Sequence, residues 1–402
     1  MKAFYDVVVV GGGPAGSVAA WHAARGGASV LLLEKDRDIG PPVRCAEGVG
    51  AEGLKLIIEP REHFIENRIE GVNLFAPNGR KVHMETDDIG FVLNRKVFDR
   101  YLAEVAAKSG AEIHTKAYVD GLLFDDGKVA GVTFLSQGRR FSVRSHIVIG
   151  ADGVESRVGR WAGIRTQLKL KDLETCAQYT LANISVDARY CDFYFSRELA
   201  PGGYLWIFPK GDGIANVGLG ISGADAQKGA SPKRLLDRFL AEHFPGAAIL
   251  TTTIGGVPVA STLKQIVKPG LMLVGDAARQ ANPVSGGGIV SGMIAGKLAG
   301  QTAAEAVSKG NFSERFLKRY EKRWYQEEGN NHKTFYRIKE AIYRLSDDDL
   351  NKIAESFLAL PEEDRTLGAL FKTALFRRPE LVFDAMMVFK DQLRASISSR
   401  RK

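Results

Sequence analysis

The residues with the clearest chemical potential are three glycines and one glutamate near the N-terminus. Gly11, Gly13 and Gly16 give the spacing GxGxxG directly after the apolar run FYDVVVV, and Glu34 ends a second apolar run roughly 20 residues on. These glycines permit a tight turn, close backbone approach to a pyrophosphate and close helix packing, while the acid accepts hydrogen bonds from a ribose. The pattern predicts a bound dinucleotide, and the carboxylate favours FAD or NAD over NADP.

Two further carboxylates follow short apolar runs that we expect to be buried strands. They are Asp152 and Asp276, and the loop after the second contains Gly287, Gly288 and Ile289 at the start of a predicted helix. The carboxyl ends of parallel strands meet at one edge of a sheet. We therefore expect both acids at the dinucleotide, with Asp276 on a ribityl hydroxyl and the loop amides against a flavin ring.

A proline- and glycine-rich loop after the second strand contains Arg44, Cys45, Ala46 and Gly48. Such a loop can hold amides and a thiol against a flavin, although a free cysteine is more often a small buried hydrophobe. Arg95 lies in the first turn of a predicted helix, where a cation is unfavourable unless it faces an anion. It is either a ligand of the cofactor phosphates or a solvent-facing side chain, and the pattern leaves both interpretations open.

Three aromatic residues alternate along a predicted strand in the second half of the chain. Tyr204, Trp206 and Phe208 fall on one face, because successive side chains of a strand point to opposite faces. A row of this kind is either part of a core or a wall of an apolar ligand pocket.

The composition is typical of a globular protein, and the net charge suggests anionic partners. The 402 residues are 45% hydrophobic and 25% charged, with a net charge of +8. Three separated cysteines without a CxxC pair indicate no metal site and favour a reducing cytoplasm. The charge suits phosphate esters or the cytoplasmic face of a membrane, where we expect peripheral contact, although a merely solvated basic surface would look the same. We expect no nucleic-acid partner, since no binding motif accompanies the charge.

The element pattern predicts an α/β fold, α+β overall: a Rossmann-type FAD-binding domain, an antiparallel-sheet substrate domain and a C-terminal helical region. We assign the first to 1–50, 93–164 and 265–310, the second to 51–92 and 165–264, and the third to 311–402. Within the last region the segment 379–396 is close to an amphipathic helix, which would either pack on the protein or lie on a membrane.

Taken together, these motifs resemble a known family. The sequences GADG at 150–153, GDA at 275–277 and GGGI at 286–289, with the opening GxGxxG, resemble the FAD-binding fold of the p-hydroxybenzoate hydroxylase group. Within that group, the segments 42–48 and 201–209 are similar to the geranylgeranyl reductase family, and most to its archaeal lipid branch, the digeranylgeranylglycerophospholipid reductases. The resemblance covers roughly residues 1–310.

This resemblance implies an oxidoreductase acting on CH–CH groups, in which reduced FAD saturates the geranylgeranyl chains of membrane ether lipids. It places Glu34 on the adenosine ribose, Arg95 on the phosphates and the Val119 backbone on the adenine. By motif position it implies FAD contacts from Ala15, Glu34, Cys45, Ala46, Gly48, Arg95, Val119, Asp276, Gly288 and Ile289.

An isolated alkene is a poor hydride acceptor, so a proton must also be delivered, and a dry apolar tunnel is needed. Tyr204, Trp206 and Phe208 are the candidates for lining such a tunnel. Cys45 could assist as a proton donor or redox partner, but the residues do not fix that role.

Several other functions share parts of this pattern. An aromatic-hydroxylase monooxygenase has the same cofactor motifs, and a tryptophan halogenase would show WxWxIP, which 204–209 only partly matches. A quinone oxidoreductase of the electron-transfer flavoprotein type would need cluster cysteines. A prenyl-binding escort of the Rab GDI type would use a related fold without flavin. Since no second GxGxxG marks a nicotinamide domain, ferredoxin, a deazaflavin and a nicotinamide all remain possible electron donors.

Overall fold

The computed structural model describes residues 1–361, 364, 365, 369 and 373, so the predicted helix at 379–396 lies outside the described residues. The chain divides into two compact units, each with its own sheet and apolar core. The mixture of parallel and antiparallel sheet with helices confirms the predicted fold class. The first unit comprises Met1–Ile65, Leu93–Lys169 and Val257–Asn330, and the second comprises Glu66–Val92, Leu170–Gly256 and Asn331–Lys402.

The sheet of the first unit aligns four strand ends at one edge. Val10 at the end of β1 pairs with Leu33 of β2 and with Gly150 of β9, and Gly150 pairs with Leu273 of β16, all in parallel. The loops that follow these strands therefore leave the sheet side by side. The strands are β1 (Phe4–Val10), β2 (Val30–Leu33), β6 (Glu112–His114), β7 (Tyr118–Asp125), β8 (Lys128–Ser136), β9 (Arg139–Gly150), β15 (Val267–Lys268) and β16 (Leu271–Leu273).

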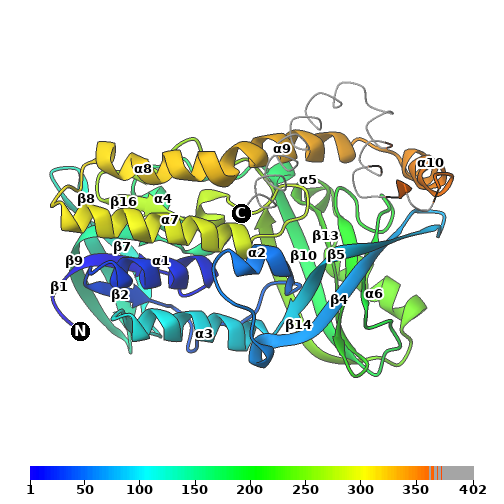
Figure 1. Ribbon diagram of the computed structural model, residues 1–402, viewed down its shortest axis with the longest axis horizontal. Helices are drawn as coiled ribbons and strands as arrows, with labels where there is room; N and C mark the ends of the chain where they lie inside the picture. The colour runs from blue at the N-terminus through cyan, green and yellow to red at the C-terminus, as the bar shows by residue number, and fades with distance from the viewer. Residues whose placement is uncertain (362–363, 366–368, 370–372, 374–402) are drawn as a thin grey trace. The chain divides into compact units, whose positions relative to one another are not determined.

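Two helices of this unit, α1 (Pro14–Arg25) and α7 (Ile289–Ser308), lie side by side (Figure 1) and approach closely at two glycines of α7. A Cβ on Gly296 would stand 2.2 Å from the Ala15 carbonyl oxygen, and one on Gly300 would stand 2.4 Å from that of Ala19. Only glycine permits this approach, which brings the N-termini of both helices to the same sheet edge. The other helices are α2 (Ala51–Lys55), α3 (Arg95–Lys108), α4 (Arg157–Trp161), α8 (Glu314–Trp324), the turns η1 (Glu62–Phe64), η2 (Gly153–Glu155) and η4 (Gly275–Ala278), and the π-helical η5 (Tyr325–Gly329).

The second unit is built on a mostly antiparallel sheet with the strand order β14-β10-β13-β12-β11-β4-β5-β3, in which β3 is Gly48–Gly50. The one pairing between β11 and β4 is parallel. The strands are β4 (Ile65–Phe75), β5 (Lys81–Leu93), β10 (Leu173–Ala182), β11 (Tyr190–Tyr194), β12 (Tyr204–Gly211), β13 (Ile214–Ser222) and β14 (Ala248–Pro258). The helices are η3 (Leu170–Asp172), α5 (Gly223–Gln227), α6 (Pro232–His243), α9 (Asn330–Ile342) and α10 (Asp347–Leu358).

The two faces of this sheet differ in chemistry. Leu205 and Ile207 of β12 point into an apolar core that includes Leu236 and Phe239 of α6. Trp206 points to the opposite face, where its indole Nε1 donates to Gln178 Oε1 at 2.9 Å. Strand alternation places Tyr204 and Phe208 on this face as well, so the aromatic row lies outside the α6 core.

Candidate functional site

The loops at the carboxyl edge of the first sheet lie against one another. A Cβ on Gly11 would stand 2.3 Å from the Ala151 carbonyl oxygen, so the loop carrying Asp152 packs directly on the glycine turn. A Cβ on Gly288 would stand 3.3 Å from Asp276 Oδ1, so the N-terminus of α7 lies beside the acid that follows β16. Three segments that are far apart in the sequence therefore meet at this edge.

The glycine turn has one crowded position and one open position. A Cβ on Gly16 would stand 1.9 Å from the Gly11 carbonyl oxygen, whereas a Cβ on Gly13 would meet no atom of the described residues within 4 Å. Because of this crowding, helix packing alone explains why a glycine is required at position 16. The open space over the second, at the N-terminus of α1, is where a pyrophosphate can approach the backbone.

Glu34 is held in place by the backbone of the same edge. Its carboxylate accepts the Gly12 N–H at 2.6 Å and the Asp36 N–H at 2.9 Å. An ionised carboxylate has about four acceptor positions, so capacity remains for a ribose hydroxyl. The Ala117 N–H donates to the Glu34 carbonyl at 2.8 Å, which brings the start of β7, and with it the buried Val119, beside this acid.

Within the part of the chain that the structure describes, two buried polar atoms at this edge have no protein partner. Asp152 Oδ2 accepts the Val158 N–H at 2.9 Å, but its Oδ1 and the Ser291 hydroxyl near the start of α7 are buried without a hydrogen bond. Burial raises the pKa of Asp276 to about 6, and nearby Arg95 opposes that shift. Unsatisfied buried polar groups call for an explanation. Ligand hydroxyls would satisfy them, so the residues present fit the polyhydroxylated chain of FAD.

The loop at Cys45 is fixed by Glu47, a residue that the sequence did not single out. Glu47 is buried at φ 75°, and its carboxylate Oε1 accepts the Arg95 N–H at the start of α3 at 2.9 Å. Its own N–H donates to Cys45 Sγ at 3.2 Å, and its carbonyl accepts the Leu93 N–H at 2.9 Å. Burial raises the pKa of the Cys45 thiol, while Arg95 opposes the shift. The loop therefore presents a protonated thiol.

Arg95 is buried rather than solvent-facing. Its guanidinium donates two hydrogen bonds to Asp99, at 2.5 and 2.7 Å, and the two side chains are only 13% and 3% exposed. The i,i+4 spacing of Arg95 and Asp99 is the sequence pattern from which this ion pair could have been predicted. Asn94 caps the helix by accepting the Val97 N–H at 3.2 Å. Of the loop residues before it, Arg44 is exposed, and Ala46 and Gly48 are half-buried.

We expect Glu47→Ala to lower the free energy of unfolding by about 1–2 kcal/mol, because it removes an anionic cap from the N-terminus of α3. Cys45 should also react faster with a disulfide reagent, since its loop loses the hydrogen bond from the Arg95 N–H that holds it in place. Urea unfolding and thiol-labelling rates measure the two effects. Glu104→Ala is the matched control, because Glu104 forms an exposed ion pair with Arg100 on the same helix. Equal stability and labelling in the two variants would contradict this role.

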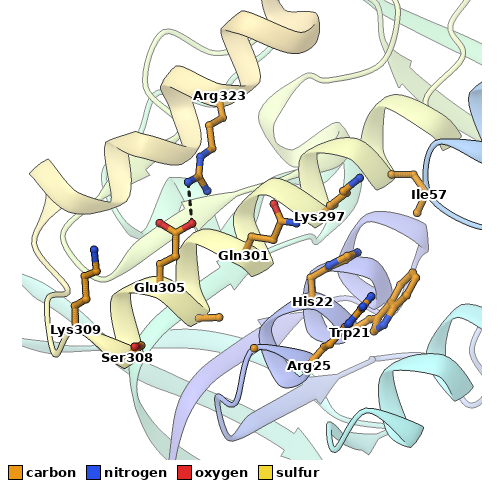
Figure 2. A pocket seen from close by; sticks show the side chains of 12 residues that line it. Trp21, His22, Arg25, Ile57, Lys297, Gln301, Glu305, Ser308, Lys309 and Arg323 are labelled. Atoms are coloured by element: carbon orange, nitrogen blue, oxygen red, sulfur yellow. Dashed lines mark hydrogen bonds and ion pairs between the residues drawn. The ribbon is translucent and has the colours of Figure 1, made fainter. Parts of the chain in front are cut away.

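A pocket lies where α1, α7 and α8 run side by side (Figure 2). The cavity has a volume of about 860 Å³ and four basic side chains, from Arg25, Lys297, Lys309 and Arg323. Its single carboxylate, Glu305, is neutralised by Arg323 at 2.7 Å. His22 adds no charge at neutral pH, because burial and two nearby cations lower its pKa to about 4. The cavity is therefore strongly positive.

Sequence and structural comparisons agree with this geometry. Residues 6–201 match the model of FAD dependent oxidoreductases, and residues 172–257 match that of the geranylgeranyl reductase catalytic domain. The digeranylgeranylglycerophospholipid reductase of Methanosarcina acetivorans is 46% identical over 406 residues, covering all of both chains. A geranylgeranyl bacteriochlorophyll reductase-like structure from Thermoplasma acidophilum is 37% identical with a TM-score of 0.89, covering 95% of this chain and 98% of the other.

A more distant structure, the flavin-dependent brominase Bmp2, shares the fold with 18% identity and a TM-score of 0.69 over 94% of this chain and 99% of the other. The matched regions define the class of the molecule: it is an FAD-dependent oxidoreductase. Relatives that match nearly the whole chain exceed 40% identity. The chain belongs to the digeranylgeranylglycerophospholipid reductase family.

Proposed function

We propose that this chain saturates the double bonds of geranylgeranyl chains in isoprenoid ether phospholipids. The observation that carries the proposal is the 46% identity to the Methanosarcina reductase across the full length of both chains, so that both units are represented. The partly matching aromatic segment 204–209 and a fold shared with a brominase at 18% identity do not favour a halogenase or a hydroxylase.

When bound and reduced, FAD supplies the hydride equivalent for this reaction. We assign its binding to the first unit, with the pyrophosphate over Gly13, the adenosine ribose on Glu34 and the ribityl hydroxyls near Asp152 and Asp276. Gly288 and the Cys45 loop would border the ring. We further propose that Trp206 and its aromatic neighbours bind the isoprenoid chain and exclude water, and that electrons arrive from a separate donor: ferredoxin, a deazaflavin or a nicotinamide.

The direct test incubates the FAD-loaded protein and a chemical reductant with a geranylgeranyl glycerophospholipid without oxygen. We expect mass spectrometry to show hydrogen added two atoms at a time. A product that instead gains oxygen when air is admitted would support a monooxygenase. Protein that binds the lipid but takes up no flavin would support an escort. In the same assay, unchanged turnover of Cys45→Ala would remove the thiol from the mechanism.

We also propose that the positive cavity of Figure 2 rests on an anionic membrane surface, where such a substrate resides. Beside the cations lie the half-buried Trp21 and Ile57, and Leu56 is 60% exposed with its carbonyl accepting from Lys297 Nζ at 3.4 Å. Basic residues next to exposed apolar and indole side chains are typical of interfacial membrane contacts. Among the described residues, no helix is both long and apolar enough to cross a membrane.

The double variant Arg25→Glu with Lys297→Glu should bind vesicles containing anionic phospholipid at least tenfold more weakly. Each basic residue near such a surface contributes about 1 kcal/mol. Co-sedimentation measures the effect, which should shrink in high salt. Arg100→Glu is the control, since it changes one exposed charge on α3. Equal loss of binding in the control, or equal wild-type binding to neutral vesicles, would contradict a specific role of the cavity.

A further inference from the structure

A carboxyl group is buried on the aromatic face of the second sheet. Glu174 of β10 is 5% exposed, and the hydroxyl of Tyr343, the residue that follows α9, donates to its Oε1. A Cβ on Gly220 would stand 2.9 Å from Glu174 Oε2 and 3.1 Å from Cys176 Sγ, so this glycine leaves room for both groups. Tyr204 pairs with Gly220 from the other side. The acid therefore shares the sheet face of the proposed isoprenoid site.

Among the residues that the structure describes, Lys339 of α9 is the positive group that acts on this carboxyl. Its Nζ also contacts Asp172 and Glu340, each at 3.4 Å. The neighbouring Cys176 and Tyr343 are neutral, because burial raises the pKa of both. Burial likewise raises the pKa of Glu174 to about 7, although the Tyr343 hydrogen bond and Lys339 oppose the shift. Such an acid can be protonated near neutral pH.

We propose that Glu174 is the general acid that protonates the isoprenoid double bond, with Tyr343 as its positioning residue. This assignment rests on the proposed function. The O–H bond of Glu174 breaks as a C–H bond forms at one alkene carbon. The adjacent carbon receives the hydride that the proposed function assigns to the reduced cofactor. Water then returns a proton to the carboxylate before the next turnover. A buried carboxyl whose pKa is raised to about 7 can hold a proton at neutral pH and give it up during turnover.

The first experiment mixes the reduced, FAD-loaded protein with geranylgeranyl lipid in the absence of oxygen. Glu174→Gln keeps the shape of the side chain but cannot supply the proton, so reoxidation of the flavin by lipid should slow about a hundredfold or more. Its reoxidation by oxygen should not change. Cys176→Ser is the matched control on the same face and should retain turnover. Thermal unfolding checks that both variants fold.

The second experiment measures the protonation state of Glu174 in the absence of turnover. The infrared carboxylic-acid band of Glu174, identified by its loss in Glu174→Gln, should disappear as the pH rises through about 7. Lipid reduction by the wild type should fall over the same range. Tyr343→Phe removes a hydrogen bond that favours the ionised form of Glu174. The pH at which the infrared band disappears and the pH at which lipid reduction falls should therefore both be higher. A structural role alone would not move them.

The outcomes distinguish a failure of the proposed function from a failure of the Glu174 assignment. Wild-type protein that leaves the lipid unchanged overturns the proposed function and this assignment with it. If the wild type reduces the lipid and Glu174→Gln does so at an equal rate, only the assignment is overturned. A carboxyl band that is already absent well below pH 7 also overturns it, because the group would then hold no proton to give.

Discussion

Alanine at position 13 is expected to weaken FAD binding by roughly a hundredfold, or about 2.8 kcal/mol, without destabilising the FAD-free protein. Gly13 has φ −69°, which alanine adopts freely, and its Cβ would meet no atom of the residues that the structure describes within 4 Å. The methyl group would instead occupy the space that we assign to the pyrophosphate. Flavin-fluorescence titration measures the affinity, and thermal unfolding of the FAD-free protein measures the stability.

Gly16→Ala provides the matched comparison. Its Cβ would stand 1.9 Å from the Gly11 carbonyl oxygen, so this variant should lose both stability and FAD binding. A Gly13→Ala protein that binds FAD as tightly as the wild type would show that the cofactor phosphates lie elsewhere. One that loses stability without FAD would show that Gly13 is needed for packing rather than for the ligand.

Trp206→Ala should lower the free energy of unfolding of the second unit by about 3–5 kcal/mol. The indole is buried against the bare backbone of Gly218, where a Cβ would stand 2.6 Å from the ring, and it donates to Gln178. Alanine removes the hydrogen bond and leaves a cavity. Denaturant unfolding followed by circular dichroism measures the loss.

Trp206→Phe separates packing from hydrogen bonding at this position. It keeps most of the ring volume but removes the N–H donor, so its cost should be about 1–3 kcal/mol, well below that of alanine. Equal costs for the two variants would mean that the hydrogen bond to Gln178 dominates. A cost below about 1 kcal/mol for alanine would contradict the buried packing described here.

The dinucleotide edge was predictable because its residues follow strands with local signatures. Gly11, Gly16 and Glu34 carry a spacing whose physical meaning is the same wherever the βαβ unit occurs. Asp152 and Asp276 each follow an apolar run, and parallel strands bring such positions to a common edge. The structure places these acids at that edge, and their contact with FAD stays a prediction.

The sequence could not reveal the residues that depend on distant contacts. Glu47 caps a helix that begins 48 positions later in the chain, and Tyr343 reaches Glu174 across 169 positions. No local pattern encodes such pairs. Strand alternation correctly put the aromatic row on one face, but only the packing of α6 against Leu205 and Ile207 shows which face is the core.

The most direct test of the account follows the flavin itself. The FAD-loaded protein is reduced without oxygen, mixed rapidly with geranylgeranyl phospholipid and monitored for the return of the oxidised flavin spectrum. We expect one flavin to be reoxidised for each double bond saturated, with both quantities measured on the same sample. Flavin that stays reduced in the presence of the lipid but is reoxidised by oxygen would contradict the proposed function.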